Sequence, residues 1–210
     1  MLMNAGPERA RPRRREAGFT IIELMVTISV LAVLLGIAAP LLIDFVRNNK
    51  VRAVANTLQN GLRSAQAEAV RRSQQVVFVL TNATPSGNTP VAAAVNGRNW
   101  AAYTVVPDGS TETMMLLDTG VINDVGSGVA ISGPAVLCFS SLGRLHANSA
   151  PGIASQSCAL PTGGPAQPYG VTLTQATRSL RVLVNVGGQI RMCDPSKTFD
   201  ATSAPDGCPA

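Results

Sequence analysis

The stretch FTIIELMVTISVLAVLLGIAAPLLI, residues 19–43, decides how the rest of the chain is interpreted, because it is almost wholly apolar over 25 residues. Its one charged residue is Glu23. An apolar run of about 18 residues or more is a candidate membrane span, and at a rise of about 1.5 Å per residue this one can cross a hydrocarbon core about 30 Å thick. The stretch therefore predicts a transmembrane helix.

The residues before this run are basic. Residues 1–18 carry a net charge of +3, from two glutamates and from Arg9, Arg11, Arg13, Arg14 and Arg15. Positive charge before a membrane span favours a cytoplasmic N-terminus, so the chain after residue 43 is expected on the opposite, periplasmic side. A basic stretch followed by an apolar one is also the pattern of a cleaved secretory signal. This run is longer than a usual signal core, and no small-residue cleavage site follows it cleanly, but composition alone leaves a simple anchor and a cleaved signal both open.

Glu23 is an unusual residue for such a helix. A carboxylate inside a membrane segment costs about 2.5–3.5 kcal/mol on insertion scales and is rare without a partner. It is therefore a candidate functional residue. The alternative is a glutamate near the cytoplasmic end whose side chain reaches the membrane surface.

The string RRREAGFTIIELMV, residues 13–26, resembles the cleavage and methylation motif of type IV prepilins and type II secretion pseudopilins. The resemblance implies that a prepilin peptidase cuts between Gly18 and Phe19 and N-methylates Phe19. It implies that Glu23 meets the methylated amine of a neighbouring subunit during assembly, which would offset the cost of a buried carboxylate. Pro40 falls where many members have a helix-bending proline. The leader is longer than many in the family, and translation from Met3 would shorten it.

A second helical pattern follows the apolar run. Apolar residues recur every three or four positions at Val51, Val54, Leu58, Leu62, Ala65 and Ala69, which is one face of a helix. We expect one helix over about 19–73 whose second half packs on the head. The arginines off this stripe, including Arg52 and Arg63, are most simply residues of a solvent-exposed helix face. The more specific alternative is that they contact phosphate or lipid.

From residue 75 onward, short β-type runs alternate with turn formers. Strands are expected at 75–81, 100–106, 113–117, 128–132, 135–140, 169–174, 179–186 and 189–192, with Gly187 and Gly188 as a two-residue hairpin turn. The fold class is therefore α+β, a long helix packed on an antiparallel, β-rich head. The expected organisation is a leader over 1–18, a transmembrane or filament-core helix over 19–43, its amphipathic half over 44–73 and a periplasmic head over 74–210.

The chain has four cysteines, no CxxC pair and a single histidine, His146. Zinc sites need closely spaced Cys and His ligands, so no metal is expected. An even number of cysteines in an exported head favours two disulfides. Sequence order suggests Cys138–Cys158 and Cys193–Cys208 among three connectivities, and closing a loop of about 15 residues could contribute roughly 3 kcal/mol. A Cys138–Cys158 bridge would tether the Gly/Ser/Pro-rich stretch 141–168.

The layout of the head resembles the GspH/FimT branch of minor pilins and pseudopilins. The resemblance rests on CFSSLGR at 138–144, on RVLVNVGGQIR at 181–191 and on the ending RMCDP at 191–195, which is similar to disulfide-closed tails in some members. It implies a structural subunit of a type IV pilus or a type II secretion filament in the bacterial inner membrane. The implied partners are the prepilin peptidase and other pilins, and no cofactor is implied.

Two other functions are alternatives to a structural subunit. Some members of this branch bind DNA through a basic G-R-x-R element near the C-terminus, and the matching residues here are Gly188, Gln189, Ile190 and Arg191. Gln189 replaces the first arginine, and residues 73–210 carry a net charge of −1, which weakens attraction to phosphate. The residues that could still form a DNA contact are Arg191, Arg181 and Arg144, with Arg178 and Lys197.

An enzyme is the third alternative, and the sequence holds no HExxH, G-x-S-x-G or P-loop. His146 is expected on the surface, and Asp108, Asp118 and Asp124 in turns. Trp100, Tyr103 and Phe139 are expected in the core or sheet. The sequence therefore predicts no catalytic residues.

Overall fold

The computed structural model describes residues 18–106, 112–122 and 128–209. Residues up to Leu42 and residues from Ile43 onward form two separate compact units. The expected leader, apart from Gly18, and two of the expected turn residues, Asp108 and Asp124, lie outside the described residues.

One long helix, α1, covers Ile21–Arg72. Thr20 begins it, since its Oγ1 accepts a hydrogen bond from the Glu23 backbone N–H at 3.3 Å and so satisfies a donor of the first turn. Arg71 and Arg72 lie in the last turn, where positive charge suits the helix dipole. The helix is continuous through Pro40, and the bend expected there stays a prediction. Its apolar first half is long enough to cross a membrane, and none of its most apolar stretch is buried in the chain itself.

Within the described residues, the head after α1 consists of two β-sheets. The first has the order β3-β2-β1-β5 and is antiparallel throughout, with β1 Val76–Thr81, β2 Asn99–Thr104, β3 Leu116–Val121 and β5 Val136–Phe139. The second has the order β4-β6-β7-β8-β9, with β4 Val129–Ser132, β6 Ala166–Leu173, β7 Leu180–Asn185, β8 Ile190–Thr198 and β9 Gly207–Cys208. Only its last pair, β8 and β9, is parallel. The expected α+β architecture is confirmed.

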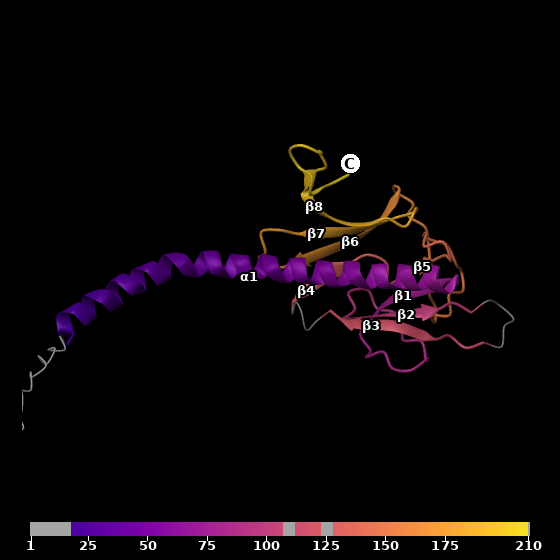
Figure 1. The fold of residues 1–210 in the computed structure, drawn as a ribbon, viewed down its shortest axis with the longest axis horizontal. Helices are drawn as coiled ribbons and strands as arrows, with labels where there is room; N and C mark the ends of the chain where they lie inside the picture. Colours follow the sequence, from indigo (N-terminus) through magenta and orange to yellow (C-terminus); the bar gives the residue numbers. More distant parts are fainter. Residues whose placement is uncertain (1–17, 107–111, 123–127, 210) are drawn as a thin grey trace, which may run out of the picture. The chain divides into compact units, whose positions relative to one another are not determined.

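The second half of α1 lies between the two sheets, with β1–β3 on one side and β6–β8 on the other (Figure 1). All six residues of the predicted apolar stripe are fully buried, so the predicted packing face is confirmed. They share one core with Phe78 of the first sheet and Tyr169 of the second. Burying a side chain such as Leu58 stabilises the fold by about 1.5–3 kcal/mol, so this core holds both sheets on the helix.

The two central strands of the first sheet are buried on both faces, since every residue of β1 and β2 is buried. A second cluster covers the face away from the helix, where Val77 and Tyr103 pack with Ile153 from the long loop after β5. The structure joins Cys138 to Cys158, which ties this loop to the sheet. The loop is therefore part of the second core.

Two of the expected strands and the expected hairpin turn differ clearly from the structure. The strand expected at 113–117 is β3, Leu116–Val121. It includes Asp118, which was expected in a turn and instead pairs with Ala102 of β2. The Ser64 hydroxyl donates a hydrogen bond to the Asp118 carboxylate. The strand also includes Gly120, where a Cβ would lie 2.4 Å from Trp100 Nε1, so only glycine fits beside the indole.

The other two differences lie in the last hairpin. Its turn closes over three residues rather than two, because the Asn185 N–H bonds to the Gln189 carbonyl. β8 continues to Thr198, through Pro195. Beyond Cys193 it no longer pairs with β7 and pairs with β9 instead. Proline is tolerated where no ladder hydrogen bond is needed.

Candidate functional site

The N-terminal segment carries the residues expected to be processed. Phe19 is 85% exposed and lies with Gly18 just before the first turn of α1. Glu23 belongs to that first turn, and its side chain has no bonded partner among the described residues. The large apolar side chains described after it, from Ile21 to Ile37 and at Leu42 and Ile43, are exposed along the helix. Such a surface needs a membrane or other helices to cover it.

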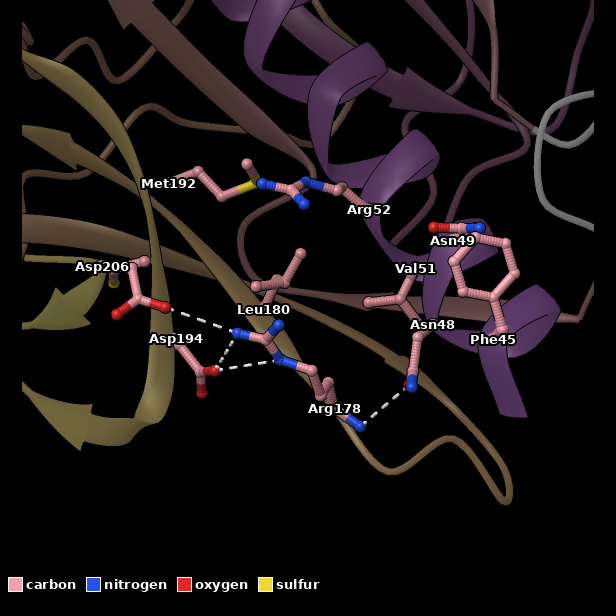
Figure 2. A pocket seen from close by; sticks show the side chains of 11 residues that line it. Phe45, Asn48, Asn49, Val51, Arg52, Arg178, Leu180, Met192, Asp194 and Asp206 are labelled. Carbon is pink, nitrogen blue, oxygen red and sulfur yellow. Dashed lines mark hydrogen bonds and ion pairs between the residues drawn. The ribbon is translucent and has the colours of Figure 1, made fainter. Parts of the chain in front are cut away.

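A cavity of about 300 Å³ lies at the end of the head where α1 enters it (Figure 2). One wall comes from the helix, and the other comes from β7, β8 and the C-terminal tail. Its lining residues are Phe45, Asn48, Asn49, Val51 and Arg52 on the helix, with Arg178, Leu180, Met192, Cys193, Asp194 and Asp206 opposite. The cavity therefore has apolar lining residues, such as Phe45 and Leu180, and a charged wall formed by Arg178, Asp194 and Asp206.

The charged wall centres on Asp194, which is only 3% exposed. The Arg178 guanidinium donates to Asp194 Oδ2 at 2.8 Å, and Ser196 donates its N–H and hydroxyl to Oδ1 at 3.0 and 2.6 Å. Burial alone would raise the pKa of this carboxyl. The Ser196 and Arg178 hydrogen bonds outweigh burial and lower the pKa to about 2.

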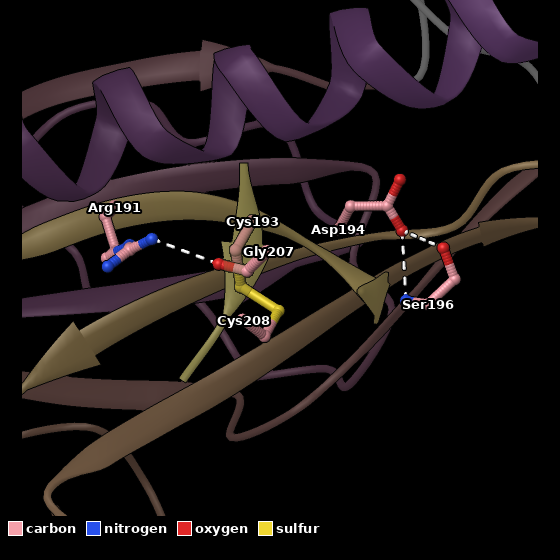
Figure 3. Close-up of a disulfide and its surroundings, with 6 residues drawn as sticks. All are labelled: Arg191, Cys193, Asp194, Ser196, Gly207 and Cys208. Atoms are coloured by element: carbon pink, nitrogen blue, oxygen red, sulfur yellow. Dashed lines mark hydrogen bonds between the residues drawn. A yellow bond between two sulfur atoms is a disulfide. The ribbon is translucent and has the colours of Figure 1, made fainter. Parts of the chain in front are cut away.

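The tail adds a second carboxylate to this network. Asp206 accepts from Lys197 Nζ at 2.8 Å and lies 3.4 Å from Arg178. The structure joins Cys193 to Cys208, beside the Arg191 bond to the Gly207 carbonyl (Figure 3). The disulfide and the ion pairs together hold the tail on β8.

Farther along α1, the side chain of Gln66 joins a turn of the first sheet to a turn of the second. Its side-chain amide donates to the carbonyl oxygens of Gly143 and Gly188 at 2.7 and 2.6 Å. These two glycines belong to the turn after β5 and to the β7–β8 hairpin, so one helix side chain holds a turn from each sheet. The approach is tight, since a Cβ on Gly188 would lie 2.2 Å from the Gly143 oxygen.

The residues expected to form a DNA contact are mostly engaged within the head. Arg191 bonds to the Gly207 carbonyl and stacks 4.8 Å from the Phe199 ring. Arg178 pairs with Asp194 and Asp206, and Lys197 pairs with Asp206, so the two carboxylates balance the two cations. Arg144 and Arg181 are exposed, and their side chains have no bonded partner within the described residues. The structure thus offers no convergent set of free cations here, and the DNA-binding alternative is not supported.

Other residues singled out from the sequence lie as follows. His146 is exposed at the rim of a polar hollow formed with Ser140 and Asn148. Trp100 is buried and stacks on Phe78 with ring centroids 5.7 Å apart. Asp194 and Gln66 were not predicted from the sequence as functional residues. No local pattern marks them, because the side chain or backbone groups that they bind lie mainly 16 to 122 residues away.

Comparisons with known proteins agree with this arrangement. The sequence model of the prokaryotic N-terminal methylation motif matches residues 13–39, and that of the type II transport protein GspH matches residues 54–188. A fimbrial protein, EcpC of Eikenella corrodens, is 32% identical over 123 residues, which cover 57% of this chain and 76% of the relative.

Two solved structures are also similar, at low identity. The type IV minor pilin FimU of Pseudomonas aeruginosa is 14% identical with a TM-score of 0.46, over 78% of this chain and 98% of FimU. The minor pseudopilin EpsH of Vibrio cholerae is 11% identical with a TM-score of 0.43, over 70% of this chain and 99% of EpsH. The methylation motif, the exposed apolar helix and a GspH match over most of the head together show that the chain belongs to the GspH family and is a minor pilin or pseudopilin.

Proposed function

We propose that the chain is made as a prepilin and is cut between Gly18 and Phe19 by a prepilin peptidase at the cytoplasmic face of the inner membrane. Phe19 is then N-methylated, and the subunit enters a type IV pilus or a type II secretion filament. In this proposal residues 1–18 are the leader and residues 19–43 join the filament core. Residues 44–73 support the periplasmic head, which comprises residues 74–210.

The observation that carries this proposal is the exposed apolar half of α1 directly after the cleavage motif. Phe19 is 85% exposed, and the large apolar side chains described between Ile21 and Ile37 are each more than half exposed. A membrane covers such a helix before assembly, and the helices of neighbouring subunits cover it afterwards. Glu23 would then meet the amine of a neighbouring Phe19, since a carboxylate in a low-dielectric bundle is costly unless it is paired.

Processing is tested by replacing Gly18 with leucine in the full chain. The expected result is an uncleaved precursor, seen as a larger mass that retains the leader, whereas Gly36→Ala, at a position with open space around it, is cleaved normally. Normal cleavage of Gly18→Leu would show that the peptidase does not cut after Gly18.

Assembly is tested with Glu23→Val, which should be inserted and cleaved but be depleted from sheared filaments. Thr27→Val, a polar-to-apolar change one turn further along α1, is the matched control. Equal incorporation of both variants would rule out the amine pairing.

The two filament systems are separated by deleting the gene. Loss of sheared surface pilin, restored by complementation, assigns the subunit to a type IV pilus. Unchanged pili together with exoproteins retained in the periplasm assign it to type II secretion.

A further inference from the structure

We infer that the cavity beside Phe45 and Arg52 holds the phosphate of an anionic phospholipid headgroup while the subunit is in the membrane. This inference rests on the proposed function, because it requires α1 to span the bilayer. It assigns a ligand to a cavity to which the proposed function gives no role.

The position of the cavity along α1 matches the headgroup layer. The apolar run ends at Ile43, and a rise of about 1.5 Å per residue places Phe45 about 3 Å and Asn48 about 8 Å beyond it. The headgroup layer on each side of a bilayer is about 5–8 Å thick. Arg52 starts about 14 Å beyond Ile43, but helix side chains lean toward the helix N-terminus, which here is the direction of the membrane.

The charges of the cavity leave one cation for a ligand. Asp194 and Asp206 are balanced by Arg178 and Lys197 in the ion-pair network. Arg52 also lines the cavity, is exposed, and has no hydrogen-bond or ion-pair partner in the described part of the chain. A guanidinium presents several N–H donors in one plane and suits the oxygens of a phosphate. Lys197 pairs with Asp206 from outside the lining, and with it these five charged residues carry a net charge of +1.

The remaining walls suit the apolar part of a lipid. Phe45 is 63% exposed at the mouth, and Leu180 and Met192 are partly buried on the opposite wall. In Figure 2 the Arg52 side chain extends from the helix toward the wall that carries Met192. A phosphate bound at Arg52 would leave its glycerol and upper acyl carbons against Phe45, which lies nearer the hydrocarbon.

Lys50 provides a matched control on the same helix. It lies two residues before Arg52, at nearly the same height above Ile43, yet it does not line the cavity. Diffuse attraction of a basic segment to anionic lipid would draw on both charges. A specific binding site in the cavity would depend on Arg52 and not on Lys50.

The test uses the full chain in nanodiscs that contain equal amounts of phosphatidylglycerol and phosphatidylcholine. Native mass spectrometry then counts the lipids that stay bound after release. The expected result is preferential retention of phosphatidylglycerol, a drop of about tenfold in Arg52→Gln, and less than a twofold change in Lys50→Gln. Both substituted residues lie outside the core, and formation of both disulfides verifies the fold.

Equal losses in the two variants, or no preference for phosphatidylglycerol, would overturn the inference. Displacement of the lipid by millimolar inorganic phosphate would also overturn it, because the site would then belong to a free anion. Resistance to alkaline carbonate extraction is measured in parallel. A chain that is extracted was never membrane-anchored, so the proposed function fails, whereas an inserted chain without bound phosphatidylglycerol contradicts only the lipid site.

Discussion

Replacing Asp194 with asparagine should destabilise the head at neutral pH and have little effect in acid. The side chain is 3% exposed and accepts hydrogen bonds from Arg178 and Ser196. Asparagine keeps its size but removes the charge and replaces one acceptor oxygen by an N–H donor, so the variant tests the carboxylate as a charged acceptor. Arg178 is half exposed, so water can solvate its guanidinium once the carboxylate is gone.

The size and sign of the effect follow from the pKa of Asp194. Its value falls from an ordinary 3.8 to about 2 in the folded head. A difference of one pH unit between folded and unfolded pKa corresponds to about 1.4 kcal/mol, so the charged form stabilises the head by about 2 kcal/mol. Because the folded pKa is depressed, this stability is fully present above about pH 4 and is lost as the pH falls toward 2.

Urea unfolding of the full chain in a mild detergent, followed by Trp100 fluorescence, measures this difference. The parent and Asp194→Asn should differ in free energy of unfolding by about 2 kcal/mol at pH 7 and converge near pH 2. Asp44→Asn, which removes a half-exposed carboxylate paired at 3.6 Å with Arg47, should change it by less than about 1 kcal/mol. Equal stability of parent and Asp194→Asn at pH 7, or a gap that persists unchanged at pH 2, would refute the assignment to charge.

Three further substitutions test other parts of the head, each by urea unfolding followed by circular dichroism. Replacing Cys193 and Cys208 together by serine opens a loop of 15 residues and should cost roughly 3 kcal/mol, and an unchanged midpoint would contradict the tether. Gln66→Ala leaves two carbonyl oxygens without their donor and should cost about 1–3 kcal/mol, whereas a loss below about 0.5 kcal/mol would mean that water replaces it. Gly120→Val places a Cβ 2.4 Å from Trp100 Nε1 and should cost about 1–3 kcal/mol by overpacking, and a neutral result would show that the indole moves aside.

The parts of the fold that the sequence predicts well are those set by local periodicity. The stripe from Val51 to Ala69 predicts the packing face of α1, because a helix buries residues three or four apart. β1 is different, since all six of its residues are buried and no alternation marks its faces. Its second face is covered by the loop tied down through Cys138–Cys158, and the burial of that face depends on contacts far apart in the chain.

The cavity and its charged wall could not be predicted in the same way. Asp194 follows Cys193 in an ordinary polar tail, and Asp206 lies in a segment typical of loops. Arg178 joins them only because β7 pairs with β8 and the second disulfide returns the tail to β8. Of the five basic residues considered for a DNA contact, Arg178, Arg191 and Lys197 are engaged by these same long-range contacts.

The two strings that resemble the GspH/FimT branch meet at one point of the structure, and this gives them a physical role. Gly143 has a φ of +72° and Gly188 of +95°, a region that favours glycine. A side chain on Gly188 would collide with the Gly143 carbonyl at 2.2 Å and would also displace the Gln66 amide. The glycine of the G-R-x-R-like element is therefore required for closing the two sheets over α1, whether or not a neighbouring arginine ever meets a phosphate. Packing alone can account for the glycine of such an element. The element in a sequence is therefore weak support for DNA binding unless free arginines accompany it.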